Sequence, residues 1–108
     1  MKYRVRYSPL AKRDLDDIWD GVVEASGSVD VAQQYINGII AAVKEKSVFP
    51  RAGIPVIGLT DAEKLYSVNY KAYKAFYYVS QDSIEVVRVL YAGRDYMKIL
   101  FPGEDEHL

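Results

Sequence analysis

The chain has 108 residues and a formal net charge of −1 at pH 7; half of its residues are apolar and 27% are charged. This is the balance of a globular domain that is large enough to bury its own core. Cysteine is absent and histidine occurs once, which excludes a disulfide framework, thiolate chemistry and a Cys/His metal site. The near-neutral charge argues against sequence-specific DNA binding by this chain itself, because such binding draws much of its affinity from cations that contact phosphates.

No stretch predicts a membrane segment or an export signal. No apolar run approaches the roughly 20 residues that span a bilayer. The first six residues alternate between apolar residues and cations instead of forming the apolar core of a signal peptide. Together with the absence of cysteine, this predicts a cytoplasmic protein that does not associate with membranes.

The first elements in chain order are a strand and a helix. In residues 2–7, three apolar residues alternate with three cations, which predicts a strand with one buried face. A helix should follow, with Ser8 as its N-cap and Pro9 in its first turn, where the missing N–H is harmless. The helix has a broad apolar stripe, and its aspartates, including Asp14, fall mostly outside that stripe. We expect it to end near Gly27.

A second amphipathic helix is predicted next. We expect it to begin at Asp30, with Gln33 at the N3 position of a capping-box variant, and to end at Phe49-Pro50. Gly38 lies in its interior and costs about 1 kcal/mol relative to alanine unless it permits close packing. Two such helices joined by a few residues form an antiparallel helical hairpin.

The second half of the chain predicts strands. Residues 51–62 contain glycines and prolines and are expected to form a loop. Strands are expected at 65–69, 72–79 and 84–91, and a short helix at 95–101. Arg88 lies inside the apolar run of the last strand, so we expect it to pair with a carboxylate inside the structure.

The predicted order is β-α-α-β-β-β with a final helical turn. It describes an α+β fold in which a two-helix hairpin packs on a largely antiparallel sheet. Residues 1–103 are expected to form one domain, and residues 104–108 an acidic tail that frays.

Five short phrases stand in a fixed order along almost the whole chain. They are Ser8 to Trp19 (S-x-x-A-x-x-D-L-x-x-I-W), Ala32-x-x-Tyr35-Ile36, Phe49-Pro50-Arg51-Ala52-Gly53, Phe76-Tyr77-Tyr78-Val79, and Ile84 to Asp95, which contains R-V-L-x-x-x-R-D. In this order they resemble the RelE/ParE toxins, the poison half of bacterial type II toxin–antitoxin pairs. The resemblance is greatest to the ParE branch, and it implies the fold predicted above.

The resemblance implies two alternative targets. RelE-like members are implied to cut messenger RNA inside the ribosome, whereas ParE-like members are implied to poison DNA gyrase without being nucleases. For a nuclease, the catalytic candidates are Lys74, Arg94 and Tyr96. Lys74 falls where the RelE branch carries an arginine, Arg94 matches a late arginine, and Tyr96 lies near the place of a tyrosine.

The nuclease pattern is incomplete in this sequence. The lysines expected in the preceding strand fall near Leu65 and Ser67, and the tyrosine expected after Arg94 falls on Leu100. The histidine, His107, lies in the acidic tail. An RNA-cleaving enzyme needs a base, an acid and cations around the phosphate. We therefore expect a toxin that acts by binding and not by catalysis; if it is an enzyme, it is an endoribonuclease.

The leading hypothesis is a ParE-like toxin that inhibits DNA gyrase and is neutralised by a cognate antitoxin. The resemblance implies an antitoxin whose disordered tail folds onto apolar grooves of the toxin. The candidates for that contact are Trp19, Val23 and Tyr35 on the outer edge of the helix pair.

The candidates for contact with the target are Lys74, Tyr91 and Arg94. Two alternatives remain open at this point: a ribosome-dependent mRNA endoribonuclease, and a degenerate toxin that acts only as co-repressor with its antitoxin. No cofactor and no metal are expected in any of the three.

Overall fold

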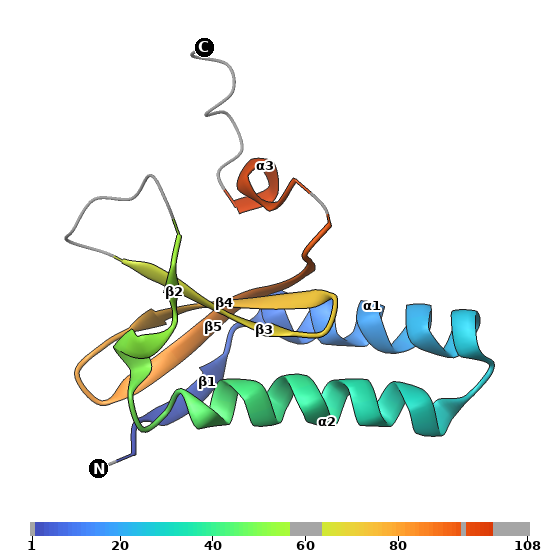
Figure 1. Cartoon of the computed structure of the whole chain (residues 1–108), viewed down its shortest axis with the longest axis horizontal. Helices are drawn as coiled ribbons and strands as arrows, with labels where there is room; N and C mark the ends of the chain where they lie inside the picture. The colour runs from blue at the N-terminus through green and yellow to red at the C-terminus, as the bar shows by residue number, and fades with distance from the viewer. Residues whose placement is uncertain (1, 57–63, 94, 101–108) are drawn as a thin grey trace.

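Two long helices cover one face of a five-stranded sheet, and a short helix lies on the opposite side (Figure 1). The computed structural model describes residues 2–56, 64–93 and 95–100. Its elements are β1 (Arg4–Tyr7), α1 (Pro9–Ser26), α2 (Val29–Glu45), a 3-10 turn (Pro50–Ala52), β2 (Ile54–Pro55), β3 (Leu65–Tyr70), β4 (Tyr73–Val79), β5 (Ser83–Tyr91) and α3 (Tyr96–Leu100). The predicted α+β fold is confirmed. Residues 104–108, expected as a tail, lie outside the described residues.

The sheet joins the two ends of the described fold. Its strand order is β1-β5-β4-β3-β2, so β1, at one edge, lies beside the last strand of the chain. β1 runs parallel to β5, with Arg4 opposite Ser83, and the other neighbouring strands are antiparallel. The sheet is thus largely antiparallel, as expected.

Helix α1 begins and ends as the sequence predicts. The Ser8 hydroxyl accepts a hydrogen bond from the backbone N of Ala11 at 3.0 Å, and Pro9 occupies the first helical position. At the other end Gly27 adopts φ 70°, and its N–H donates to the Val23 carbonyl at 2.8 Å. A left-handed residue of this kind favours glycine, which has no Cβ to clash with the backbone.

Helix α2 begins earlier than predicted. Its N-cap is Ser28, whose hydroxyl accepts from the backbone N of Val31 at 3.2 Å. The expected N-cap Asp30 lies inside the first turn instead, where its negative charge suits the positive end of the helix dipole. The prediction that Gln33 is the N3 residue was therefore wrong, because the short connection around Gly27 leaves a serine in reach of the free N–H groups.

The range predicted as a loop contains a strand. β2 pairs antiparallel with β3 at the edge of the sheet, with Pro55 opposite Tyr66. Proline is compatible with an edge strand because its missing donor faces away from the ladder. The turn before β2 is fastened by Tyr77, whose hydroxyl donates to the Pro50 carbonyl at 2.6 Å. A Cβ on Gly53 would come within 2.1 Å of that hydroxyl, so this position requires glycine.

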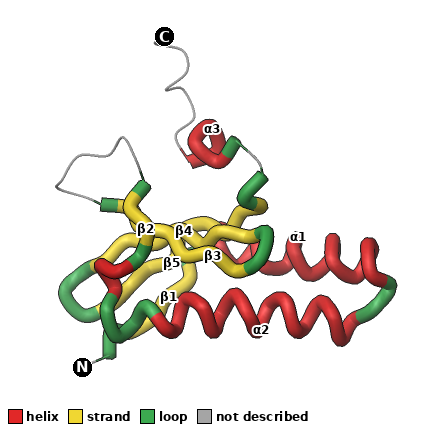
Figure 2. Tube along the Cα trace, viewed as in Figure 1, coloured by secondary structure: helices red, strands yellow, loops and turns green. Residues whose placement is uncertain are grey.

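Helices lie on both sides of the sheet (Figure 2), and apolar side chains form a core on each of its faces. The buried residues of the helix-side core are Ala11, Ile18, Val22, Ala32, Ile39, Val43, Tyr66, Ala75, Tyr77, Ile84, Val86 and Val89. The far-side core consists of Leu65, Phe76 and Leu90, against which Tyr96, Ile99 and Leu100 of α3 pack. Because both faces of β4 and β5 are covered, these strands carry apolar residues on both faces, as predicted.

No helix within residues 2–56, 64–93 and 95–100 is both long enough and apolar enough to cross a membrane.

Candidate functional site

Strand β5 is irregular where it passes the end of β1. Its register with β4 shifts between Phe76 and Tyr77, which lie opposite Arg88 and Val86, so Val87 is an extra residue. A bulge of this kind leaves backbone groups unpaired and bends the strand.

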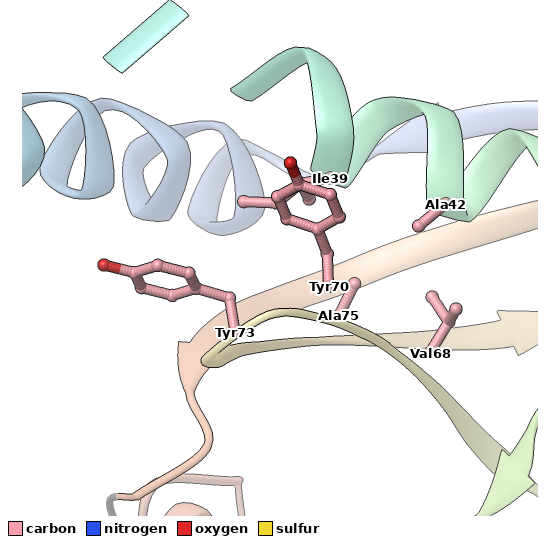
Figure 3. A pocket seen from close by; sticks show the side chains of 6 residues that line it. All are labelled: Ile39, Ala42, Val68, Tyr70, Tyr73 and Ala75. Atoms are coloured by element: carbon pink, nitrogen blue, oxygen red, sulfur yellow. The ribbon is translucent and has the colours of Figure 1, made fainter. Parts of the chain in front are cut away.

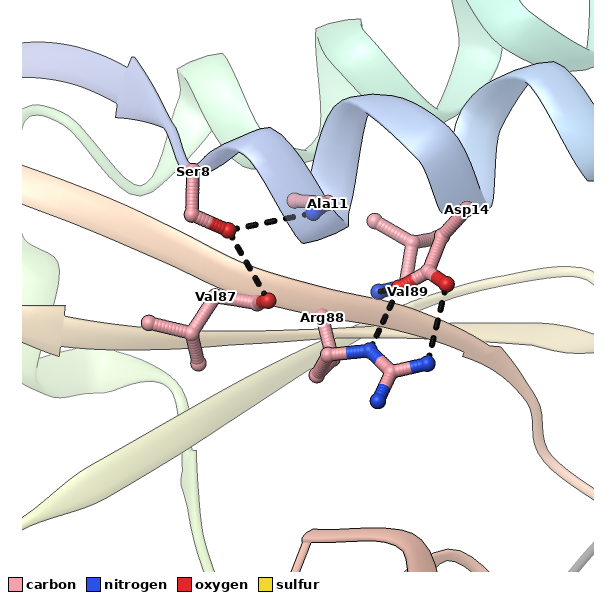
Figure 4. Close-up of polar contacts among 6 residues, drawn as sticks. All are labelled: Ser8, Ala11, Asp14, Val87, Arg88 and Val89. Carbon is pink, nitrogen blue, oxygen red and sulfur yellow. Dashed lines mark hydrogen bonds and ion pairs between the residues drawn. The ribbon is translucent and has the colours of Figure 1, made fainter.

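The N-terminal half of α1 binds the groups that the bulge frees (Figure 4). The Ser8 hydroxyl, besides capping the helix, donates to the Val87 carbonyl at 3.0 Å. Further along the helix, the Asp14 carboxylate accepts from the backbone N of Val89 at 2.9 Å. Helix α1 therefore replaces β1 as the hydrogen-bonding partner of β5 beyond the point where β1 ends.

The same carboxylate holds Arg88 in a two-fold contact. Arg88 Nε donates to Asp14 Oδ2 at 2.8 Å, and Nη2 donates to Oδ1 at 3.0 Å. The hydrogen bond that Arg88 donates to Asp14 raises the pKa of the guanidinium. The predicted carboxylate partner of Arg88 is confirmed, but the placement of Asp14 outside the buried stripe was wrong, because Asp14 is only 8% exposed. Ser8, Asp14 and Arg88 thus have a structural role in joining α1 to β5.

Four tyrosines gather where the turn between β3 and β4 meets the helices. Tyr35 packs edge-on against Tyr70 and Tyr73, with ring centroids 6.2 and 6.1 Å apart. Tyr73 packs in the same way on Tyr91 at 6.1 Å. Such edge-to-face pairs contribute about 0.5–1.5 kcal/mol each beyond the area they bury. Burial, with the neighbouring Tyr35 and Tyr91 hydroxyls, raises the pKa of Tyr73.

The Tyr70 ring is fitted closely against α2. Figure 3 shows Tyr70 and Tyr73 pointing from the strands toward the helices, with Ile39 and Ala42 of α2 above Ala75. The space among these residues leaves no room for a water molecule. A Cβ on Gly38 would lie 2.0 Å from Tyr70 Cζ, so Gly38 permits close packing, which was the exception to the expected cost of a glycine in this helix.

Lys71 lies at the tip of this turn in a strained conformation. Its φ is 51°, the one positive value of a non-glycine residue among the described residues. Its ammonium lies 4.9 Å from the centre of the Tyr35 ring and 5.6 Å from that of Tyr70. The attraction of these cation–π contacts offsets part of the free-energy cost of the strained backbone.

An open groove runs between α1 and the turn end of the sheet. It consists of two adjoining hollows of about 300 and 190 Å³, and Gly21 and Tyr73 line both of them. We call it the Gly21 groove. The larger hollow is also lined by Val22, Ala25, Ser26, Val31, Tyr35 and Ala72, and the smaller by Asp14, Asp17, Ile18, Val89, Leu90 and Tyr91.

The groove exists because the helical hairpin is longer than the strands beneath it. In Figure 1 the connection between α1 and α2 extends well past the β3–β4 turn. The inner face of the outer helical turns is therefore not covered by strands. The larger hollow has the size and the mainly apolar lining that are typical of sites that bind another molecule.

The three residues predicted to contact an antitoxin all lie in the helix layer. Trp19, Val23 and Tyr35 are half-buried and pack against the helix-side core. Tyr35 also lines the Gly21 groove, whereas Trp19 and Val23 do not.

Two of the nuclease candidates lie together on the far side of the sheet. Lys74 Nζ lies 5.8 Å from the centre of the Tyr96 ring, and this ring packs on Phe76 with centroids 5.2 Å apart. The third candidate, Arg94, lies outside the described residues.

The target candidates do not share one face. Tyr91 lies opposite Tyr73 and contacts it on the helix side, while the neighbouring Lys74 pairs with Leu90 and points to the far side. Tyr91 is half-exposed in the Gly21 groove, so the structure places it with the tyrosine cluster and apart from Lys74.

On the far side of the sheet, the two positions where a nuclease would carry lysines hold buried, uncharged residues. Leu65 and Ser67 are 1% and 2% exposed, and the Ser67 hydroxyl donates to the Ile54 carbonyl at 3.3 Å. In the described part of the chain, no group of three His, Cys, Asp or Glu side chains could hold a metal ion.

The sequence prediction missed the Gly21 groove. Two features of the sequence lie at or near it: a glycine inside α1, and a run from residue 14 to residue 43 that contains six Asp or Glu and no Lys or Arg. The groove itself depends on how far the helices extend past the sheet, which no local pattern encodes.

Comparison with known proteins gives one family. The model of the family described as the ParE toxin of type II toxin–antitoxin systems matches residues 5–96. No curated protein matches. Among solved structures, the fold is similar to a chromosomal ParDE system of P. aeruginosa, with a TM-score of 0.67 and 19% identity over 83% of this chain and 96% of that chain.

Two further solved structures are similar at a greater distance. The toxin–antitoxin complex RelBE2 of Mycobacterium tuberculosis gives a TM-score of 0.54 and 16% identity over 84% of this chain and 99% of that chain. The RelE–RelB complex of Pyrococcus horikoshii gives a TM-score of 0.54 and 17% identity over 87% of this chain and 99% of that chain. These likenesses concern the fold. The match over residues 5–96, together with this fold, shows that the chain belongs to the ParE toxin family of type II toxin–antitoxin systems.

Proposed function

We propose that this toxin is neutralised by a cognate antitoxin in the cytoplasm and, when released, arrests growth by inhibiting DNA gyrase. The choice of gyrase over messenger RNA as the target rests on two residues of the far side of the sheet. Leu65 and Ser67 stand buried where an RNA-cleaving relative would place lysines, so these two positions offer no cation to a phosphorane. Lys74 alone does not replace a base, an acid and a clamp.

The family and the open groove support neutralisation by an antitoxin. The similar structures from M. tuberculosis and P. horikoshii are complexes of a toxin with its antitoxin. In the present chain an apolar groove lies uncovered between α1 and the sheet, and the half-buried Trp19, Val23 and Tyr35 lie in the same helix layer. A partner segment that folds on binding would cover such surfaces.

The test is controlled induction of the chain in bacteria, with and without the product of a short neighbouring reading frame. Growth arrest, relaxed or broken plasmid DNA and an SOS response are expected, and co-expression of the antitoxin should restore growth. Purified toxin should inhibit supercoiling by gyrase. Growth arrest with intact supercoiling would overturn the choice of gyrase, and induction without any growth effect would favour a co-repressor.

A second candidate, the ribosome-dependent endoribonuclease, has the contact between Lys74 and Tyr96 in its favour. Both side chains lie on one face, where they could take part in proton transfer. For this candidate, induction should produce cleaved transcripts, and both Lys74→Ala and Tyr96→Phe should abolish the cleavage. For a gyrase inhibitor, transcripts remain intact in the wild type.

A further inference from the structure

A short segment between α2 and β2 holds a phenylalanine in solvent. Residues 47–54, which we call the Phe49 turn, connect the end of α2 to the edge strand β2. Phe49 is 71% exposed, more than any other large apolar residue that the structure describes, and Val48 and Ile54 of the same turn are 43% and 52% exposed. Single exposed apolar residues are common on proteins, but three within one short turn are typical of a surface that another molecule covers.

The exposure of Phe49 does not come from a loose chain, because the turn is fastened on both sides of it. Before Phe49, the carbonyl of the buried Ser47 accepts the Tyr3 N–H at 2.8 Å. After Phe49, the Pro50 carbonyl accepts the Tyr77 hydroxyl at 2.6 Å. The backbone that carries Phe49 is therefore fixed before any partner arrives, and such preorganisation lowers the entropy cost of binding.

Cations surround the apolar residues of the turn. Lys44, Lys46 and Arg51 flank it in sequence, with Glu45 as the acid among them. Lys2 lies at the same corner, since the residue after it is bonded to the turn. None of these four cations makes an ion pair with a described residue. An apolar centre with a basic rim complements a partner whose apolar pocket is edged by carboxylates.

Two observations favour a protein other than the antitoxin as the occupant. Val48 and Ile54 are aliphatic and offer nothing to phosphates, so the turn suits a protein partner better than a nucleic acid. The Gly21 groove lies at the other end of α2, a helix of 17 residues and thus about 25 Å long (Figure 1). The turn and the groove are therefore separate surfaces, and growth arrest requires a partner besides the antitoxin.

We propose that the Phe49 turn docks the toxin on gyrase. Phe49 enters an apolar pocket of the enzyme, Val48 and Ile54 exclude water around it, and Arg51 pairs with a carboxylate at the edge of the pocket. Aromatic and arginine side chains are those on which the affinity of protein interfaces most often depends. This assignment rests on the proposed inhibition of gyrase, and it adds a surface that was not among the predicted target contacts.

The test compares purified toxin variants in a gyrase supercoiling assay and, in parallel, for binding to full-length antitoxin. Phe49→Ala should raise the concentration for half-inhibition about tenfold or more, and Arg51→Gln about fivefold. Both variants should bind antitoxin like the wild type and keep its denaturant midpoint, because the replaced side chains are exposed. Val29→Ala is the matched control: it truncates a 58% exposed apolar side chain at the opposite end of α2 and should inhibit like the wild type.

Undiminished inhibition by Phe49→Ala would overturn the assignment, as would equal losses in Phe49→Ala and Val29→Ala. A parallel loss of antitoxin binding would make the turn an antitoxin contact and overturn it too. So would a toxin that binds duplex DNA in the absence of gyrase and loses that binding in Phe49→Ala.

A wild-type toxin that leaves supercoiling intact would instead refute the choice of gyrase. Growth arrest on induction then tests the turn by itself. Arrest that is lost in Phe49→Ala but kept in Val29→Ala would support docking through the turn on another protein, and arrest kept in both would overturn it.

Discussion

Asp14 and Arg88 are joined by two parallel hydrogen bonds of 2.8 and 3.0 Å, and the same carboxylate accepts the backbone N–H of Val89 at 2.9 Å. One side chain of α1 thus satisfies both a charge and an unpaired strand amide. Planar two-fold contacts between guanidinium and carboxylate are among the strongest and most specific hydrogen-bonded pairs in proteins. The pair therefore fixes α1 on the bulged part of β5.

Replacement of Asp14 by asparagine should destabilise the protein by about 2–3 kcal/mol, because it leaves Arg88 without its counter-charge and weakens the bond to Val89. Denaturant unfolding of the purified toxin measures the loss. Asp16→Asn, an exposed change two residues away on the same helix, is the control and should have almost no effect. Equal midpoints for the two variants would show that the pair does not hold the helix.

Alkaline pH should unfold the protein through its buried tyrosines. Burial raises the pKa of both Tyr7 and Tyr77 to about 12. In the unfolded chain these phenols ionise near pH 10, so the stability is unchanged below pH 10 and falls as pH rises from 10 to 12. Each such tyrosine lowers the stability by at most about 1.4 kcal/mol per pH unit in this window.

Two phenylalanine variants separate the contributions. Tyr77→Phe should flatten the alkaline loss but lower stability at pH 7, because it deletes the hydrogen bond to the Pro50 carbonyl. Tyr7→Phe should flatten the loss without that cost, since the buried Tyr7 hydroxyl has no partner among the described residues. Unfolding curves at pH 7, 10 and 11 measure both effects, and a wild type equally stable at pH 7 and pH 11.5 would contradict the prediction.

Gly38→Ala should destabilise the fold even though alanine is the better helix former. The added Cβ would overlap the Tyr70 ring, and the ring would have to leave its contacts with Tyr35. We expect a loss of about 1–3 kcal/mol, as for other overpacked cores. Thermal or denaturant unfolding gives the magnitude. The double variant Gly38→Ala, Tyr70→Ala should show less than the sum of the two single losses, since both changes act on one contact.

Lys71 allows strain and cation–π attraction to be measured separately. Lys71→Ala keeps the positive φ but removes the contacts with Tyr35 and Tyr70, so it should lower stability by about 0.5–1 kcal/mol. Lys71→Gly also removes the contacts but relieves the strained backbone, so it should be more stable than the alanine variant by about 1 kcal/mol. Identical unfolding midpoints for the two variants would show that φ 51° carries no cost.

The elements that follow from local patterns could be predicted from the sequence. Ser8, Pro9 and Gly27 mark the bounds of α1 through interactions that span a few residues, and the apolar runs of β4 and β5 indicate strands covered on both faces. β2 could not be predicted, since two residues with a proline form a strand only because β3 lies beside them.

The site was harder to predict because its geometry comes from residues distant in sequence. Asp14 resembles the neighbouring surface aspartates of α1, and only the bulge near Val87 shows why this one is buried. Lys74 and Tyr91 were both candidates for contact with the target, yet the register places them on opposite faces of the sheet.

The parallel pairing of β1 with β5 has a consequence for synthesis on the ribosome. Among the described strands, the first has one neighbour in the sheet, and this neighbour is the last of them. Until translation has passed Val86, the Arg4–Tyr7 segment has nothing to pair with, and contacts so far apart in sequence form slowly. The growing polypeptide consequently completes its tertiary structure only after β5 has been synthesised, and a partner that binds the folded sheet can bind only from that point on.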